Sequence, residues 1–168
     1  MSLTMQSWID YLNISSLDSR QQKIIKFIFL WMQYNDWYSS TYHLSDSEGS
    51  QKISENFGAR DIYETLKEEI LNGGQDVSKG FLRIPVKHDS QIPREGIYKD
   101  NGQLLCAYNR DVNCFCKYLK AVYKIRCNFF HGNKYPEEAD IDLIIWAYES
   151  LNLLLAKLKQ QRIIRISL

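Results

Sequence analysis

"LDSRQQKIIKFIFLWMQYNDWYSSTY" (17–42) predicts a long helix and, with it, the fold class. Its main apolar strip repeats every three or four residues, the spacing at which side chains share one face of an α-helix: Ile24, Phe27, Ile28, Trp31, Tyr34 and Tyr38. A second apolar strip follows beside it: Ile25, Phe29 and Met32. Because the helix is apolar over more than half of its circumference, we expect it to lie centrally in a helical bundle. Asp18 or Ser19 is the expected N-cap.

Four other segments show the same helical spacing: "MQSWIDYLN" (5–13), "KISENFGARDIYETLKEEILN" (52–72), "RDVNCFCKYLKAVYKIRCNFFHG" (110–132) and "NKYPEEADIDLIIWAYESLNLLLAKLKQQ" (133–161). Glycines at 73, 74 and 132 suit helix C-termini, and Pro136 suits the first position of the last helix. A polar loop is expected over 43–51. These elements predict an all-α protein, an antiparallel helical bundle in a single domain over residues 1–168.

Residues 75–110 interrupt the helical pattern. This region contains Pro85 and Pro93, which do not fit helix interiors. "KDNGQ" (99–103) is a turn signal between "GIY" and "LLCAY". We therefore expect an irregular insertion in the bundle, with one short β-hairpin as the candidate structure within it.

Composition indicates an ordinary soluble globular protein. Hydrophobic residues make up 45% and charged residues 24% of the chain, and the formal net charge is +1, so any basic site must be local. No apolar run reaches the roughly 18–20 residues that span a bilayer. "MSLTMQSW" lacks the basic flank and apolar core of a signal peptide, which predicts a cytoplasmic protein without a membrane partner. "MSL" also fits a vector remnant before a start at Thr4 or Met5.

The four cysteines do not follow a usual zinc pattern. They are Cys106, Cys114, Cys116 and Cys127. Zinc sites usually contain C-x-x-C pairs, whereas this chain has one C-x-C and scattered histidines. We expect reduced thiols that pack as small apolar side chains, and we expect no metal or other cofactor. A metal site is the weaker alternative.

"IRCNFFHGNK" (125–134) places an arginine within an apolar helical stripe. Arg126 is in phase with residues expected to face the core: Phe115, Leu119, Val122, Phe129 and Phe130. Burying an unpaired guanidinium is costly. Its head must therefore reach solvent, a pocket or a subunit interface.

A histidine follows Arg126 at a spacing that suits phosphate chemistry. His131 lies about 7.5 Å further along the helix axis, a distance that an arginine side chain can bridge. Asn128 and Cys127 precede His131 by three and four residues and so neighbour it on the helix surface. Arginine binds phosphate oxygens through its planar fork, and histidine moves a proton near neutral pH. Two other interpretations are a simple cap before Gly132 and a Cys127–His131 thiolate–imidazole pair.

The sequence "VYKIRCNFFHGNK" (122–134) resembles the signature of HEPN domains, in which four to six residues separate an Arg from a following His. "FIFLWMQYNDWYSSTY" (27–42) resembles the first long helix of that family, where a Trp is followed by an Asn or similar residue and an aromatic. The resemblance covers these two helices closely and the rest of the chain in outline.

The resemblance implies a helical bundle that forms a homodimer, with two Arg–His motifs across a shared cleft. It further implies a metal-independent endoribonuclease, often a toxin or defence effector held in check by an antitoxin protein. Arg126 would stabilise the scissile phosphate, and His131 would act as general base or acid while the ribose 2′-hydroxyl attacks. The products would be a 2′,3′-cyclic phosphate and a 5′-hydroxyl.

The chain departs from the family pattern at one position. Active members usually have a polar residue, commonly Asn, directly after the Arg, whereas this chain has Cys127, with Asn128 one position later. We expect Asn128 and Cys127 to support the site. The alternative function is a non-catalytic HEPN-like module for dimerisation and nucleotide or RNA binding, and a plain helical scaffold is the third interpretation.

Other candidate RNA contacts lie outside the Arg–His pair. Lys134 and Tyr135 follow His131 closely, and Tyr135 could stack on an unpaired base. "AKLKQQRIIRISL" (156–168) carries four cations and no acid: Lys157, Lys159, Arg162 and Arg165. This tail is typical of a solvated helix end, and an RNA backbone contact is its alternative function.

Overall fold

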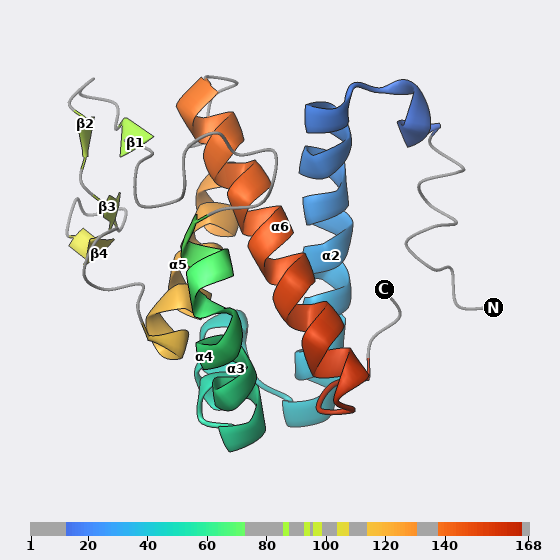
Figure 1. The fold of residues 1–168 in the computed structure, drawn as a ribbon, viewed down its shortest axis with the longest axis vertical. Helices are drawn as coiled ribbons and strands as arrows, with labels where there is room; N and C mark the ends of the chain where they lie inside the picture. Colours follow the sequence, from blue (N-terminus) through green and yellow to red (C-terminus); the bar gives the residue numbers. More distant parts are fainter. Residues whose placement is uncertain are drawn as a thin grey trace.

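The computed structural model describes residues 13–72, 86–87, 93–94, 96–98, 104–107, 114–130 and 138–165 (Figure 1). A short 3-10 helix, η1 (Ile14–Ser16), precedes five α-helices: α2 (Ser19–Tyr42), α3 (Asp46–Ser54), α4 (Phe57–Asn72), α5 (Phe115–Phe130) and α6 (Glu138–Gln160). The predicted all-α bundle is confirmed. The helix predicted over 5–13 falls almost entirely outside the described residues.

Helix α6 lies at the centre of the bundle and packs against α2, α4 and α5. Figure 1 shows α2 and α6 running downward while α4 and α5 run upward. Two ion pairs fix the parallel course of α2 and α6: Arg20 Nη2 to Asp142 Oδ1 at 2.6 Å, and Lys23 Nζ to Glu149 Oε1 at 2.7 Å. The prediction that α2 is the central helix was therefore wrong.

Helix α2 begins where the sequence predicts. Asp18 is the N-cap, and its carboxylate accepts hydrogen bonds from the backbone amides of Arg20 and Gln21. The Gln21 side chain accepts in turn from the Asp18 amide, which completes a capping box. The main apolar strip is largely buried, but the second strip is not, because Met32 is 57% exposed.

The segment between α2 and α4 differs from the prediction. Residues 43–51 were expected to form a loop and 52–72 a single helix, whereas α3 begins at Asp46 and α4 begins at Phe57. The Glu48 carboxylate stabilises the start of α3. It accepts hydrogen bonds from the amide and the hydroxyl of Ser45, and these bonds lower the pKa of Glu48. Asn56 starts α4, because its side-chain oxygen accepts from the Ala59 amide at 3.0 Å.

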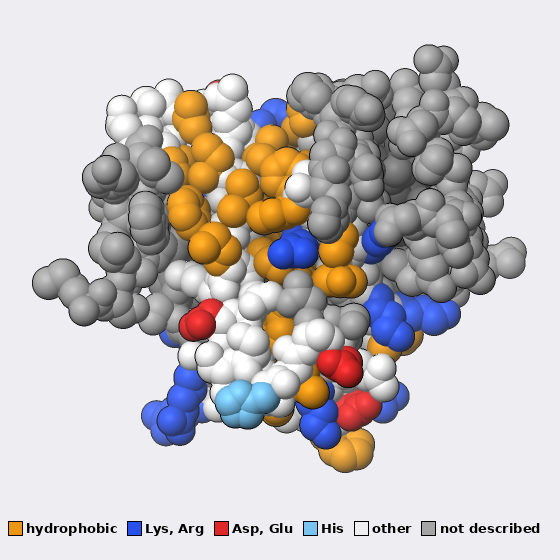
Figure 2. Space-filling model, turned by 180° about the vertical axis from the view of Figure 1, so that it is seen from behind, with side chains coloured by type: hydrophobic (Ala, Val, Ile, Leu, Met, Phe, Trp, Pro, Cys, Tyr) orange, Lys and Arg blue, Asp and Glu red, His pale blue; other side chains and the backbone are white. Residues whose placement is uncertain are grey.

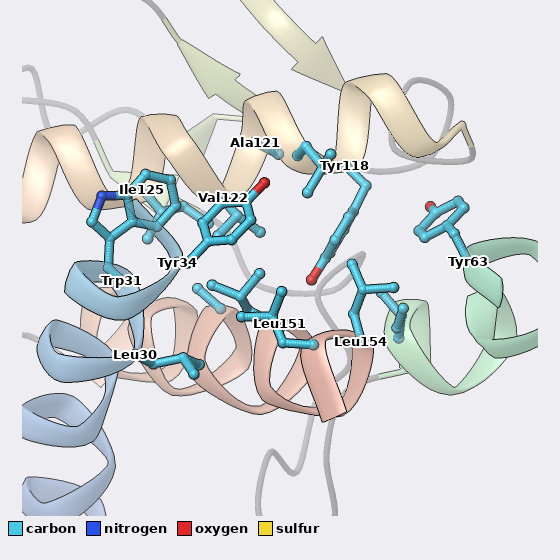
Figure 3. Packing of buried hydrophobic residues seen from close by; sticks show 14 of the residues in the cluster. Leu30, Trp31, Tyr34, Tyr63, Tyr118, Ala121, Val122, Ile125, Leu151 and Leu154 are labelled. Atoms are coloured by element: carbon cyan, nitrogen blue, oxygen red, sulfur yellow. The ribbon is translucent and has the colours of Figure 1, made fainter. Parts of the chain in front are cut away.

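Aromatic side chains dominate the core between the helices. Figure 3 shows Trp31 and Tyr34 of α2 beside Val122 and Ile125 of α5, with the Tyr118 ring further along the same helix. The Tyr118 hydroxyl donates to Ser150 Oγ at 3.0 Å, and burial raises the pKa of this phenol, so it remains a donor. Because the buried polar atoms of this pair are satisfied, the core keeps one side-chain arrangement.

The predicted hairpin is present in the insertion. Strand β3 (Gly96–Tyr98) pairs antiparallel with β4 (Leu104–Ala107), on either side of the "KDNGQ" turn signal. A second pair, β1 (Val86–Lys87) with β2 (Pro93–Arg94), was not predicted. Both pairs are too short to change the fold class.

Helix α5 starts later than predicted. Helix α5 begins at Phe115 rather than at residue 110, because the Cys114 carbonyl accepts the first helical bond, from the Tyr118 amide at 3.0 Å. Its described part ends at Phe130, directly before His131. Gly132 and Pro136 lie outside the described residues.

Candidate functional site

The face of the bundle opposite α6 carries exposed apolar side chains. Figure 2 shows this face from behind, with hydrophobic side chains gathered over its upper half and a Lys or Arg side chain among them. Among the described residues, the large hydrophobic side chains with high exposure are Met32, Phe57 and Phe130. Met32 lies on α2 and Phe130 at the end of α5, so both helices contribute to an open apolar surface.

Arg126 lies at the junction of these two helices and is partly buried. Its guanidinium carbon is 4.7 Å from the centre of the Phe130 ring and 5.8 Å from the Trp31 ring. Both distances are within the range of a cation–π interaction, which orients a guanidinium without neutralising its charge. We call Trp31, Met32, Arg126, Cys127 and Phe130 the Arg126 surface.

The ring of Trp31 is itself fixed in the core. Trp31 is 2% exposed and meets Tyr34 edge to face, with ring centres 5.4 Å apart. Its ring also lies 6.2 Å from that of Tyr123 on α5. By contrast, Phe130 is 44% exposed. The guanidinium therefore rests between one immobile ring and one that borders solvent.

Cys127 is a polar neighbour of Arg126. Arg126 Nη1 donates to Cys127 Sγ at 3.9 Å, a weak bond to a poor acceptor. Cys127, Cys116 and Cys114 are all free thiols, and Cys114 is exposed. Cys127 is only partly buried, so the expectation of fully buried cysteines was wrong for the described ones. Cys106 lies in β4, and its side chain is outside the description.

The structure brings together part of the predicted site. Arg126 and Cys127 are adjacent on α5, and the backbone of Asn128 belongs to the last turn of that helix, while its side chain is not described. His131, Lys134 and Tyr135 lie outside the described residues. The Arg–His juxtaposition stays a prediction.

Sequence reasoning missed two contributors to the site. Trp31 and Phe130 were taken as apolar stripe residues, whereas they hold the guanidinium of Arg126. It also missed the charge of α5, which carries four cations and no acid: Lys117, Lys120, Lys124 and Arg126. A count of charged residues in α5 would have revealed its positive charge. The ring contacts of Arg126 depend on α2 meeting α5, which sequence spacing cannot show.

Within the described part of the chain, no group of three or more His, Cys, Asp or Glu side chains is placed to hold a metal ion. None of the helices in these described residues has the length and apolar character to cross a membrane. Comparison with protein-family models, with curated proteins and with solved structures finds no match to this chain. The geometry around Arg126 is therefore the basis for a function.

A guanidinium fixed in this way suits a phosphodiester. Two rings lie against it, and α5 itself carries four cations and no acid. Such a group can stabilise the extra negative charge that forms on a phosphoryl group in a transition state. A solvated arginine would lose bound water and side-chain entropy before it could bind a phosphate.

Proposed function

We propose that the protein is a metal-independent endoribonuclease of the HEPN type. The observation that carries this proposal is Arg126, held between Trp31 and Phe130 at an open apolar surface of a helical bundle. The two rings lie against the guanidinium and help to orient it, as suits a phosphate ligand.

The proposed reaction uses the ribose 2′-hydroxyl as nucleophile. His131 takes the proton from that hydroxyl, and the oxygen attacks the adjacent phosphorus. The bond from phosphorus to the 5′-oxygen breaks, and this oxygen leaves after gaining a proton. Arg126 stabilises the charge on the non-bridging oxygens. The products are a 2′,3′-cyclic phosphate and a 5′-hydroxyl, with no change in oxidation state.

A second copy of the chain completes the proposed site. Met32 on α2 and Phe130 on α5 are both exposed, Phe130 lies against Arg126, and exposed apolar area marks interaction surfaces. Two copies related by a two-fold axis would cover the same area on each and bring two Arg126 side chains together. RNA is then the substrate and a homodimer the active form. A toxin or defence role, with an antitoxin protein as partner, belongs to the same proposal.

One observation favours a second candidate function. Arg126 Nη1 donates to Cys127 Sγ, a poor acceptor, where active HEPN domains usually have a polar residue. A weaker polar neighbour reduces the support for catalysis. The second candidate is a non-catalytic dimeric module that uses Arg126 to bind a nucleotide or RNA.

Cleavage in the presence of excess EDTA tests the proposal. Wild type, Arg126→Ala, His131→Ala and Arg20→Ala would be incubated with several RNAs, after their folding is checked by circular dichroism. Arg20 is the matched control, because it carries the same charge on a different helix, where it pairs with Asp142. We expect cleavage with cyclic-phosphate ends by wild type and Arg20→Ala.

We expect losses of about 100-fold or more for Arg126→Ala and His131→Ala. Binding of RNA without cleavage by any protein would favour the non-catalytic module. Equal cleavage by all four proteins would show that the nuclease is a contaminant or uses another site. Loss of activity in EDTA that returns with Mg²⁺ would contradict the metal-independent mechanism.

A further inference from the structure

The end of α6 and the start of α4 meet at one end of the bundle. Figure 1 shows α6 ending at the bottom, whereas α5, which carries Arg126, ends toward the top. The turn after α6 packs against α4: a Cβ added to Gly58 would stand 3.0 Å from Ile163 Cδ1. Residues 159–165 therefore lie beside the first turn of α4. We call Phe57, Arg60, Lys159, Arg162 and Arg165 the basic end.

Charge at the basic end is predominantly positive. All four cations are exposed, and none of them takes part in an ion pair within the described residues. The chain has no acidic residue after Glu149. On α3 and α4, Glu55 and Glu64 are already paired with lysines three residues away. Asp61 is the acid that remains beside Arg60, so the cations of the basic end outnumber their neighbouring acids.

Arg162 occupies a backbone position that glycine normally fills. Its φ is 58°, in the left-handed region, where an L side chain is strained. The amide of Ile163 donates to the Leu158 carbonyl at 2.9 Å, and the amide of Arg162 to the Lys159 carbonyl at 2.9 Å, so Arg162 is the C′ residue of a Schellman motif. Strain of this kind at a non-glycine residue points to a role for its side chain.

An exposed aromatic ring completes the basic end. Phe57 is 81% exposed, the highest value among the large hydrophobic side chains described. It is the first residue of α4, three residues before Arg60. The capping bond from Asn56 to the Ala59 amide fixes this turn, so the ring projects from an ordered helix start. A ring beside several cations is the arrangement with which proteins bind single-stranded nucleic acids.

We propose that the basic end binds single-stranded RNA, with Arg60, Lys159, Arg162 and Arg165 on the phosphates and Phe57 stacked on an unpaired base. The inference rests on the proposed function for the choice of RNA, but it concerns a second surface, remote from Arg126. Its role is to hold substrate, because the basic end contains no group placed for proton transfer. An anionic membrane surface is the competing partner, and the single ring on a mostly arginine surface favours the nucleic acid.

Binding would be measured with a fluorescein-labelled 2′-O-methyl oligouridine, which lacks the 2′-hydroxyl and cannot be cleaved by the proposed reaction. The variants are Arg162→Gly, Phe57→Ala and the far-end control Arg20→Gln. We expect Arg162→Gly to raise Tm by about 2–4 °C, because the strain is relieved. The same variant should weaken binding and reduce the slope of log Kd against log salt by about 0.7. Phe57→Ala should weaken binding roughly tenfold.

Opposite changes in stability and affinity are the signature of the proposal. Arg162→Gly that is more stable and binds as wild type does would overturn it, as would equal weakening by Arg20→Gln. Binding of wild type to phosphatidylserine vesicles but not to the oligonucleotide would also overturn it and identify a membrane surface. Binding that follows the prediction without any cleavage in EDTA would leave this inference standing while the nuclease proposal fails. If Arg162→Gly and Phe57→Ala cleave limiting RNA as wild type does, the nuclease proposal would stand and this inference would fail.

Discussion

Arg126 and Arg162 use the same side chain in two different ways. Arg126 lies partly buried between two rings on a regular helix, where its guanidinium carbon is 4.7 Å from one ring centre and 5.8 Å from the other. Arg162 is exposed and lies near other cations, on a strained backbone. The first arrangement fixes a charge in space, and the second spreads mobile charge over a surface.

This difference suits Arg126 to catalysis and Arg162 to RNA binding. A fixed cation in apolar surroundings stabilises charge that develops at one atom, and it pays no reorganisation cost during the reaction. Mobile cations in water attract a polyanion over a distance and lose this effect as salt increases. We therefore expect variants at the Arg126 surface to change kcat, and variants at the basic end to change affinity for RNA.

The largest expected effect comes from replacing Arg126 by lysine. Arg126→Lys retains the charge, but it removes the planar fork and the stacking on Phe130 and Trp31. We expect kcat for RNA cleavage to fall about 100-fold, with little change in Tm. Arg162→Lys is the matched control, and its kcat should equal that of wild type. Steady-state kinetics on one RNA would measure both, and similar kcat values for the two lysine variants would remove the distinction between the two regions.

The next effect concerns the apolar part of the Arg126 surface. Met32→Glu places a charge on a side chain that is 57% exposed, so the fold should tolerate it, whereas a two-fold interface would bring two such charges together. We expect the homodimer to dissociate and cleavage to fall at least tenfold at micromolar protein. Sedimentation velocity would measure the oligomeric state. Phe57→Glu is the control, because Phe57 is exposed at the other end of the bundle, and it should remain dimeric.

A monomeric wild type would contradict this part of the proposal. A dimer that persists in Met32→Glu and dissociates in Phe57→Glu would move the interface to the basic end. In that case the basic end could not hold RNA in the manner proposed. The two variants therefore test the comparison from both sides.

Sequence patterns predicted the helices well where capping and apolar spacing agreed. Asp18 and the stripe through Trp31 define α2 in the sequence as they do in the structure. The start of α3 and the break before α4 were missed, because Glu48 and Asn56 act through a few local side-chain bonds that leave no periodic signal. The central place of α6 was missed for a different reason: which apolar face is covered depends on packing among several helices.

The site was predicted in part, for a similar reason. The position of Arg126 in an apolar stripe indicated that its head must leave the core, and this is local information. Its contact with Trp31 joins residues 95 positions apart, and only the meeting of α2 and α5 produces it. The strain at Arg162 is likewise invisible in the sequence, because nothing before the structure shows that the chain turns there with a positive φ.

The smallest expected effect tests whether Phe130 orients Arg126 through its aromatic ring or only through its apolar area. Phe130 is 44% exposed, so its replacement should cost little stability, but its ring is the nearer of the two that hold Arg126. A cation–π contact of this exposure is worth about 0.5–2 kcal/mol. We expect Phe130→Leu to lower kcat severalfold and Phe130→Tyr to keep it near the wild-type value, because tyrosine restores the ring face. KM should change little in both, since the basic end would still hold the RNA. Equal kcat for the leucine and tyrosine variants would mean that Phe130 acts only through its apolar area, and that its ring face does not orient Arg126.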